Sequence, residues 1–215
     1  MLRNPHIRTM KLKLFTSVVL SVLTVLVAVE AGTKPVQVLF IGDSLTAGLG
    51  VLPEQAYPAL IQERLNQSKN SRVKVINGGI SGSTSAGAYS RLKWYLRVRP
   101  DVLVLALGAN DGLRGLPVAQ MKTNLARAIS LAKKSNIKVI LCGMEVPPNY
   151  GPVYARDFGQ VYPELAREFQ ISLVPFLLEG VGGQARLNQA DGIHPTPEGH
   201  KIIARTVLPY ILEQL

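Results

Sequence analysis

Runs of apolar residues alternate along the chain with stretches in which apolar residues recur every three or four positions. The runs predict strands at 36–41, 72–76, 102–107, 138–144 and 171–174. The helical spacing predicts helices at 57–66, 85–98, 117–135, 154–169 and 197–215. The run at 102–107 is apolar throughout and predicts a central strand, whereas 72–76 alternates basic and β-branched residues, as an outer strand does. Strands that alternate with helices predict one α/β domain of three layers, α/β/α, around a parallel five-stranded sheet.

Residues 1–31 follow a different pattern, in which basic residues precede an apolar run at 14–29 and small residues follow. This order is typical of a secretory signal. Met10 is a second candidate start, because Met-Lys-Leu-Lys begins a complete signal by itself. An uncleaved membrane anchor is the alternative, but the run is short for a span of about 20 residues. We expect a signal peptide at 1–31, cleavage after Ala31, and an exported domain at 32–215, periplasmic or secreted, without stable membrane insertion.

Charge and cysteine content narrow the possible partners. The chain carries 24 basic and 14 acidic residues, a net charge of +10, but they are scattered, which makes nucleic-acid binding a weak interpretation. Cys142 is the single cysteine and lies in an apolar run, where we expect a small buried side chain. His6 belongs to the predicted signal, which leaves two histidines, too few with one cysteine for a typical metal cluster. We expect no metal, no cofactor and no nucleic acid, and a monomer.

Polar residues follow several predicted strands, at ends that share one edge of a parallel sheet. The segments are Gly42-Asp43-Ser44, Gly79-Ile80-Ser81-Gly82, Gly108-Ala109-Asn110-Asp111 and, before the last helix, Asp191-Gly192-Ile193-His194. They contain a hydroxyl nucleophile, an imidazole base, a carboxylate that could orient the base, and donors for an oxyanion. These are the groups that acyl transfer requires.

Each of these residues also has a structural interpretation. Ser44 after a strand fits a turn or a helix N-cap, and His194 fits a turn without a catalytic role. We favour His194 as the base because it lies in a loop, whereas His200 falls inside the last predicted helix. Asp191, three residues before His194, can accept its Nδ1 proton. Asp43 and Asp111 are expected to hold turns.

The combination resembles the SGNH hydrolases, also called the GDSL family. Gly42-Asp43-Ser44-Leu45, Gly82, Asn110 and Asp191-x-x-His194 match the family's blocks in order, and residues 109–115, 148–151 and 191–195 resemble its exported thioesterase I/lysophospholipase/arylesterase branch. The resemblance implies a flavodoxin-like SGNH fold and a catalytic triad of Ser44, Asp191 and His194. It also implies an oxyanion hole made by the backbone N–H groups of Ser44 and Gly82 and the side-chain amide of Asn110. Ser83 departs from the branch, which often has an acidic residue there, and Ala109 replaces a common glycine.

The resulting hypothesis is a serine esterase that hydrolyses carboxylic esters or thioesters, of arylesterase, acyl-CoA thioesterase or lysophospholipase type, through an acyl-enzyme on Ser44. Residues 112–117 are expected to form either a mobile flap over the acyl chain or a plain loop. The alternatives are a carbohydrate O-acetylesterase on the same fold, a catalytically dead flavodoxin-like binding module, and a basic surface binder.

Overall fold

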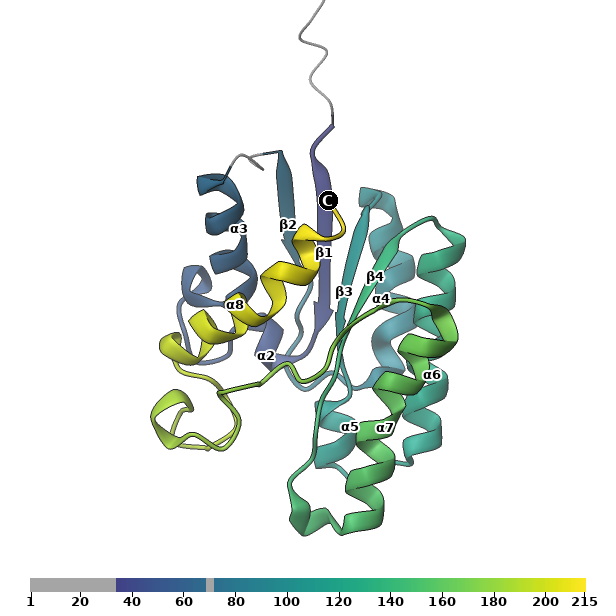
Figure 1. The fold of residues 1–215 in the computed structure, drawn as a ribbon, viewed down its shortest axis with the longest axis vertical. Coiled ribbons are helices and arrows are strands. Elements are labelled where there is room, and N and C mark those ends of the chain that lie inside the picture. The colour runs from purple at the N-terminus through teal and green to yellow at the C-terminus, as the bar shows by residue number, and fades with distance from the viewer. Residues whose placement is uncertain (1–33, 69–71) are drawn as a thin grey trace, which may run out of the picture. The chain divides into compact units, whose positions relative to one another are not determined.

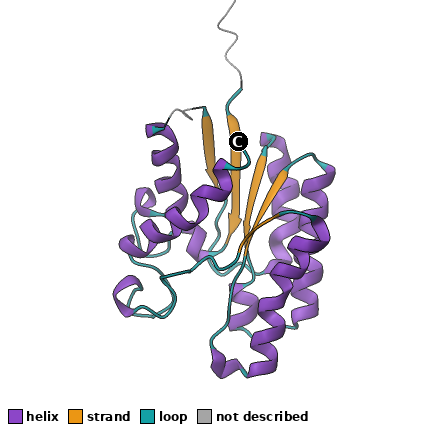
Figure 2. Ribbon diagram, in the orientation of Figure 1, coloured by secondary structure: helices purple, strands orange, loops and turns teal. Residues whose placement is uncertain are grey.

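The computed structural model describes residues 34–68 and 72–215, and the compact unit comprises Pro35–Leu215. The predicted signal peptide at 1–31 lies outside the described residues. The compact unit is a three-layer sandwich in which a parallel sheet lies between two groups of helices (Figures 1 and 2). The predicted fold class is thus confirmed.

The sheet has five parallel strands in the order β2-β1-β3-β4-β5. Their bounds are β1 (Val36–Gly42), β2 (Val73–Asn77), β3 (Val102–Ala106), β4 (Lys138–Cys142) and β5 (Ser172–Val174). Val38 of β1 pairs with Val75 on one side and Val102 on the other. Every residue of β3 is buried, whereas β2 at the edge is only partly covered, as the two patterns predicted. Cys142 at the end of β4 is fully buried, and burial raises the pKa of its thiol to about 12.

Two groups of helices cover the sheet. One group consists of α3 (Tyr57–Gln67) and α8 (Pro197–Leu212), which contact each other. In the other, α6 (Val118–Lys134) packs between α4 (Ala88–Tyr95) and α7 (Pro152–Phe169). The buried residues of α6 recur every three or four positions and face the core: Met121, Leu125, Ala128, Ile129 and Ala132. None of the helices in the described part of the chain has the length and apolarity that a membrane span requires.

Several boundaries differ from the sequence prediction. The helix predicted at 85–98 is α-helical only over α4, with 3-10 turns η2 (Ser85–Gly87) before it and η3 (Leu96–Val98) after it. The strand predicted to reach residue 144 ends at Cys142, and the last helix ends at Leu212 rather than at the C-terminus. Two short helices were not predicted, α2 (Ser44–Ala47) and α5 (Ala109–Leu113). Both follow the carboxyl end of a strand, and each helix is too short to show a helical period in the sequence.

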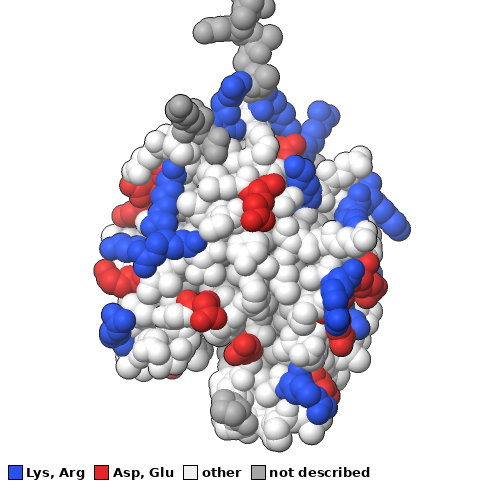
Figure 3. Space-filling view, viewed as in Figure 1, with Lys and Arg blue, Asp and Glu red and all other residues white. Residues whose placement is uncertain are grey.

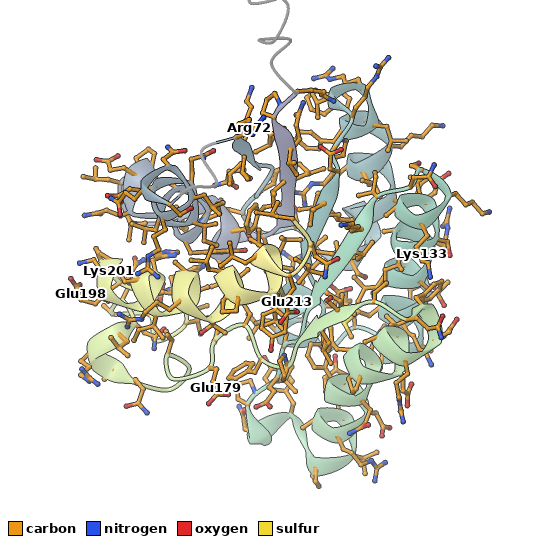
Figure 4. All side chains as sticks on the ribbon, turned by 45° about the horizontal axis from the view of Figure 1, so that its top comes forward. Arg72, Lys133, Glu179, Glu198, Lys201 and Glu213 are labelled. Carbon is orange, nitrogen blue, oxygen red and sulfur yellow. The ribbon has the colours of Figure 1, made fainter. Side chains whose placement is uncertain are left out.

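Charged side chains lie mainly on the outside of this unit. On the face drawn in Figure 3, Lys and Arg are interspersed with Asp and Glu, without a continuous basic stripe. The charged residues labelled in Figure 4 project outward from helices and loops, and Glu198 and Lys201 of α8 approach each other to 3.4 Å. Such exposed pairs contribute little to stability. The buried polar residues are more informative, and several of them lie where strands end.

Candidate active site

Ser44 is presented by the turn that joins β1 to α2. Asp43 is the N-cap of α2, and its Oδ1 accepts a hydrogen bond from the backbone N–H of Leu45 at 3.0 Å. Ser44 is therefore the first helical residue and does not cap the helix, so its hydroxyl is left for other partners. Gly42 is required because a β-carbon there would lie 1.9 Å from Oγ1 of Thr46, inside the same turn.

His194 and Asp191 complete a hydrogen-bonded chain that begins at Ser44. The Oγ of Ser44 lies 2.9 Å from Nε2 of His194, and Nδ1 of His194 lies 2.7 Å from Oδ2 of Asp191. The serine and histidine are 150 positions apart in the sequence. The structure thus brings together the three residues in which the sequence suggested a nucleophile, a base and an orienting carboxylate. A hydroxyl, an imidazole and a carboxylate in this order can activate the hydroxyl as a nucleophile.

The loop that carries His194 is fixed by its own backbone. The N–H of Gln189 donates to the carbonyl of His194 at 2.7 Å, and Asn188 and Pro195 form an isolated antiparallel bridge. Asp191 accepts from the backbone N–H groups of Ile193 and His194, both at 3.0 Å. These bonds, together with the bond to the His194 ring, lower the pKa of Asp191 to about 2. Asp191 is therefore a carboxylate over the whole neutral range, which suits a group that orients an imidazole.

Asp43 is the second acid beside Ser44, and it is almost completely buried. Burial raises the pKa of its carboxyl to about 6, although the hydrogen bonds from Leu45 and Asn110 and the proximity of His194 act in the opposite direction. Because its Oδ1 holds the N-terminus of α2, Asp43 has the turn-holding role that the sequence suggested for it. It is nevertheless also an electrostatic neighbour of the candidate base.

Asn110 lies on α5, next to Ser44 across the same pocket. Its Nδ2 donates to the carbonyl of Ser83 at 3.1 Å and makes a longer contact of 3.4 Å with Oδ2 of Asp43. Gly82 lies on the neighbouring loop after β2, with a φ of +75° that favours glycine. Asp111 holds that same loop, since its two oxygens accept from the N–H and the hydroxyl of Ser85 at 2.8 and 2.6 Å.

Sequence reasoning missed Arg114, although it lies one turn after Asn110. Its Nη2 donates to the carbonyl of Gly82 at 2.9 Å. The pattern in the sequence that indicates this arrangement is the spacing of four residues between Asn110 and Arg114, which puts both on one side of a helical turn.

The pocket beside Ser44 has a volume of about 440 Å³ and is lined mostly by apolar side chains. Ser44, Asn110 and His194 contribute polar groups to its wall. The apolar part of the wall includes Leu45, Leu113, Met144, Val146, Pro147, Phe176, Leu178 and Ile193. A pocket of this kind fits an apolar chain with one polar, reactive end.

The segment 112–117, which borders this pocket, is tied to the 3-10 turn η4 (Pro148–Tyr150) and to the start of α7. The hydroxyls of Tyr150 and Tyr154 donate to the carbonyls of Leu113 and Leu116, both at 2.9 Å. Tyr154 stacks on Phe158 at 6.2 Å between ring centroids, and the hydroxyl of Tyr162 one turn further donates to the carbonyl of Leu107 at 3.2 Å. Two tyrosine hydroxyls, one from η4 and one from α7, therefore hold this segment in the structure.

His200 takes no part in this cluster. It is buried in α8, its ring stacks on Tyr57, and its Nδ1 accepts from the backbone N–H of Tyr57 at 3.3 Å. Burial lowers the pKa of His200 to about 4, so it is neutral at physiological pH. Within residues 34–68 and 72–215 no three His, Cys, Asp or Glu side chains converge in a way that could hold a metal ion.

A parallel α/β sandwich with this serine, histidine and aspartate at its strand ends defines a class of hydrolases. Residues 40–202 match the model of the GDSL-like lipase/acylhydrolase family, and the chain belongs to this family. It is 44% identical over 172 residues to the esterase TesA of Pseudomonas aeruginosa, a match that covers 80% of this chain and 85% of the relative. It is 38% identical over 167 residues to the thioesterase 1/protease 1/lysophospholipase L1 of Escherichia coli strain K12, with 77% and 78% coverage. A crystal structure of TesA superposes with a TM-score of 0.80 at 42% identity, covering 83% of this chain and 99% of that one.

Proposed function

We propose that this protein is a serine esterase that hydrolyses carboxylic esters or thioesters through an acyl-enzyme on Ser44. The observation that carries the proposal is the continuous hydrogen-bonded chain from Ser44 through His194 to Asp191, at 2.9 and 2.7 Å. His194 removes the proton of Ser44 as the oxygen attacks the carbonyl carbon, and then donates that proton to the leaving alcohol or thiol. Water, activated by His194 in turn, hydrolyses the acyl-enzyme.

The negative charge that forms on the carbonyl oxygen is stabilised by three donors, the N–H groups of Ser44 and Gly82 and the side-chain amide of Asn110. Ser44 begins α2, and the first N–H groups of a helix have no acceptor within the helix. Asn110 donates without carrying a charge. Its 3.4 Å contact with Asp43 is the weaker of its two hydrogen bonds, and an oxyanion beside Ser44 replaces that contact.

The apolar wall of the pocket supports an acyl chain as the substrate group, with aryl esters, acyl thioesters and lysophospholipids as candidate substrates. Burial of each methylene of such a chain contributes roughly 0.8 kcal/mol. A carbohydrate O-acetylesterase, in contrast, binds a polar sugar and a two-carbon acyl group, for which this apolar wall offers few partners. The acyl side of the substrate is thus the one that the pocket favours.

Activity should be measured on p-nitrophenyl esters from acetyl to palmitoyl, together with acyl-CoA, a lysophospholipid and an acetylated xylooligosaccharide. Ser44→Ala should abolish hydrolysis while leaving the thermal unfolding midpoint nearly unchanged. An organophosphorus reagent should label the wild-type protein at Ser44 alone. Labelling at another residue, or near-normal activity of Ser44→Ala, refutes the mechanism, and a preference for the acetylated sugar refutes the substrate class.

We further propose that residues 1–31 are a signal peptide and that the exported enzyme consists of 32–215, acting as a monomer. The order of basic, apolar and small residues supports this proposal. N-terminal sequencing of exported protein should find Gly32 as the first residue. Recovery of the intact N-terminus with the membrane fraction would instead identify the segment as an anchor.

A further inference from the structure

The loop after β2 is attached to the sheet only at its beginning, as far as the described residues show. The N–H of Gly78 donates to the carbonyl of Phe40 at 2.8 Å, and the N–H of Ile80 donates to the carbonyl of Gly42 at 3.1 Å. Beyond Ile80 the chain leaves the sheet. Within residues 81–84, here called the Gly82 loop, the N–H of Ser83 donates to the carbonyl of Ile80 at 3.2 Å and closes a turn with Gly82 at its third position.

Two carbonyls of this loop bind side chains from one short stretch of the chain, α5 and the residue that follows it. Arg114 donates to the carbonyl of Gly82 at 2.9 Å, and Asn110 donates to the carbonyl of Ser83 at 3.1 Å. Two successive carbonyls are therefore held by two side chains four positions apart, which one helical turn places on the same side. Asp111 between them binds Ser85, where the Gly82 loop enters η2.

Gly82 is the residue of this turn whose carbonyl Arg114 holds. Its φ of +75° lies in the region that glycine enters freely, and it has no side chain with which to anchor itself. A β-carbon built at Gly82 would meet Nη2 of Arg114 at 3.7 Å and no other heavy atom within 4 Å. The guanidinium thus lies directly over the residue whose carbonyl it binds. The same turn of chain therefore holds one proposed oxyanion donor, Asn110, and restrains the backbone of another, Gly82.

We propose that Arg114 is a positioning residue. It holds the carbonyl of Gly82 and thereby restrains the φ and ψ angles of Gly82, on which the direction of the Gly82 N–H toward the oxyanion depends. The proposal rests on the proposed function, in which the Gly82 N–H is an oxyanion donor. Arg114 itself makes no contact with the reacting atoms. Its side chain is largely exposed, and an exposed hydrogen bond contributes little to global stability. Its effect should therefore appear in the rate of the chemical step and not in folding.

The kinetic test compares Arg114→Met, which removes both the donor and the charge, with Arg114→Lys, which keeps one charged donor. Arg114→Met should lower kcat by about tenfold with KM within twofold, because a loosely held donor is worth less than a fixed one but is not absent. Arg114→Lys should recover part of this loss. The unfolding midpoint should shift by no more than about 4 °C. Arg205→Met, an exposed arginine on α8, is the matched control and should leave both constants unchanged.

A change in KM for a lysophospholipid, without a change for neutral esters, would mean that Arg114 binds the substrate's phosphate and would overturn the proposal. Unchanged kcat in Arg114→Met would also overturn it. So would a full loss of activity in Arg114→Lys accompanied by unfolding.

A spectroscopic test separates this proposal from the proposed function. Reaction of Ser44 with a phosphonate places an anionic oxygen where the oxyanion forms, and the Gly82 amide proton should then move downfield in the ¹H–¹⁵N spectrum. In Arg114→Met the same adduct should give a smaller shift. No shift in the wild-type adduct refutes the oxyanion role of Gly82 itself. Equal shifts in the wild-type and Arg114→Met adducts leave that role intact and refute the positioning role of Arg114.

Discussion

Replacing Asp43 with asparagine should stabilise the protein at neutral pH, although the change removes a buried, hydrogen-bonded carboxylate next to the proposed nucleophile. Burial raises the pKa of Asp43 from 3.8 to about 6. A raised pKa in the folded state means that the folded protein binds the proton more tightly than the unfolded chain does, so stability falls as the pH rises between these two values. Well above pH 6 the buried carboxylate is fully charged, and the loss of folding stability that its burial causes reaches its maximum.

The size of this cost follows from the shift. About two pKa units at 1.36 kcal/mol each give about 3 kcal/mol at pH 8, and the same two-state titration gives about 1 kcal/mol at pH 4.5. Asparagine keeps an oxygen that can accept from Leu45 N–H, and Asn is as good an N-cap as Asp, so the start of α2 should survive. The free energy of unfolding of Asp43→Asn, relative to that of the wild type, should therefore rise by about 2 kcal/mol between pH 4.5 and pH 8.

Urea unfolding followed by circular dichroism at several pH values measures this difference, and other titrating groups cancel because both proteins carry them. Asp43→Ala is the control. Because it also loses the cap, it should be about 1 kcal/mol less stable than Asp43→Asn at every pH, while its difference from the wild type rises with pH at the same slope. A difference that stays constant with pH would show that Asp43 titrates near its ordinary value. A difference that falls with pH would show that hydrogen bonds outweigh burial at this site. Either result refutes the reasoning.

Two further predictions concern the neighbouring donor and the second histidine. Asn110→Ala should lower kcat by about 10²–10³ and change KM much less, because the amide acts mainly on charge formed in the transition state. Steady-state kinetics on a p-nitrophenyl ester measures both constants. A rise in KM alone would make Asn110 a substrate-binding residue. His200→Phe should keep most activity at pH 8. Burial lowers the pKa of His200 from 6.5 to about 4, so neutral His200 contributes stability above pH 6.5 that is lost as the pH falls through 4. In acid the wild type should therefore lose up to about 3 kcal/mol of unfolding free energy relative to His200→Phe. Unfolding free energies of the two proteins that change in parallel with pH would contradict this.

The sequence was sufficient for the three layers and the parallel direction of the strands because both follow from periodicity and from a general rule. The short apolar run at 102–107, ended by Gly108, favours a buried strand, and helices between strands make the sheet parallel. The predicted ends of helices and strands were less accurate where a side chain from a distant segment determines the local backbone. The N-terminal part of the helix predicted at 85–98 forms a 3-10 turn, and Ser85 there is bound by Asp111, 26 positions away.

In the candidate site, too, some residues could be identified from the sequence and others only from the structure. Ser44, His194 and Asp191 could be selected because each belongs to a motif with few competitors, and they do lie within hydrogen-bond distance of one another. Arg114, Tyr150 and Tyr154 could not be assigned a role by that route, since the role depends on which backbone carbonyl each side chain reaches. Tyr150 and Leu113 lie 37 positions apart, and no local pattern records that contact.

The distance of 150 positions between Ser44 and His194 has a consequence for when the enzyme can act. A chain that has been synthesised only as far as α7 contains Ser44 but neither His194 nor Asp191. A partly folded chain is in the same condition, because His194 reaches Ser44 only once the last loop has joined β1. Hydrolysis through Ser44 therefore requires the C-terminal segment, and esterase activity can report that the domain has folded completely.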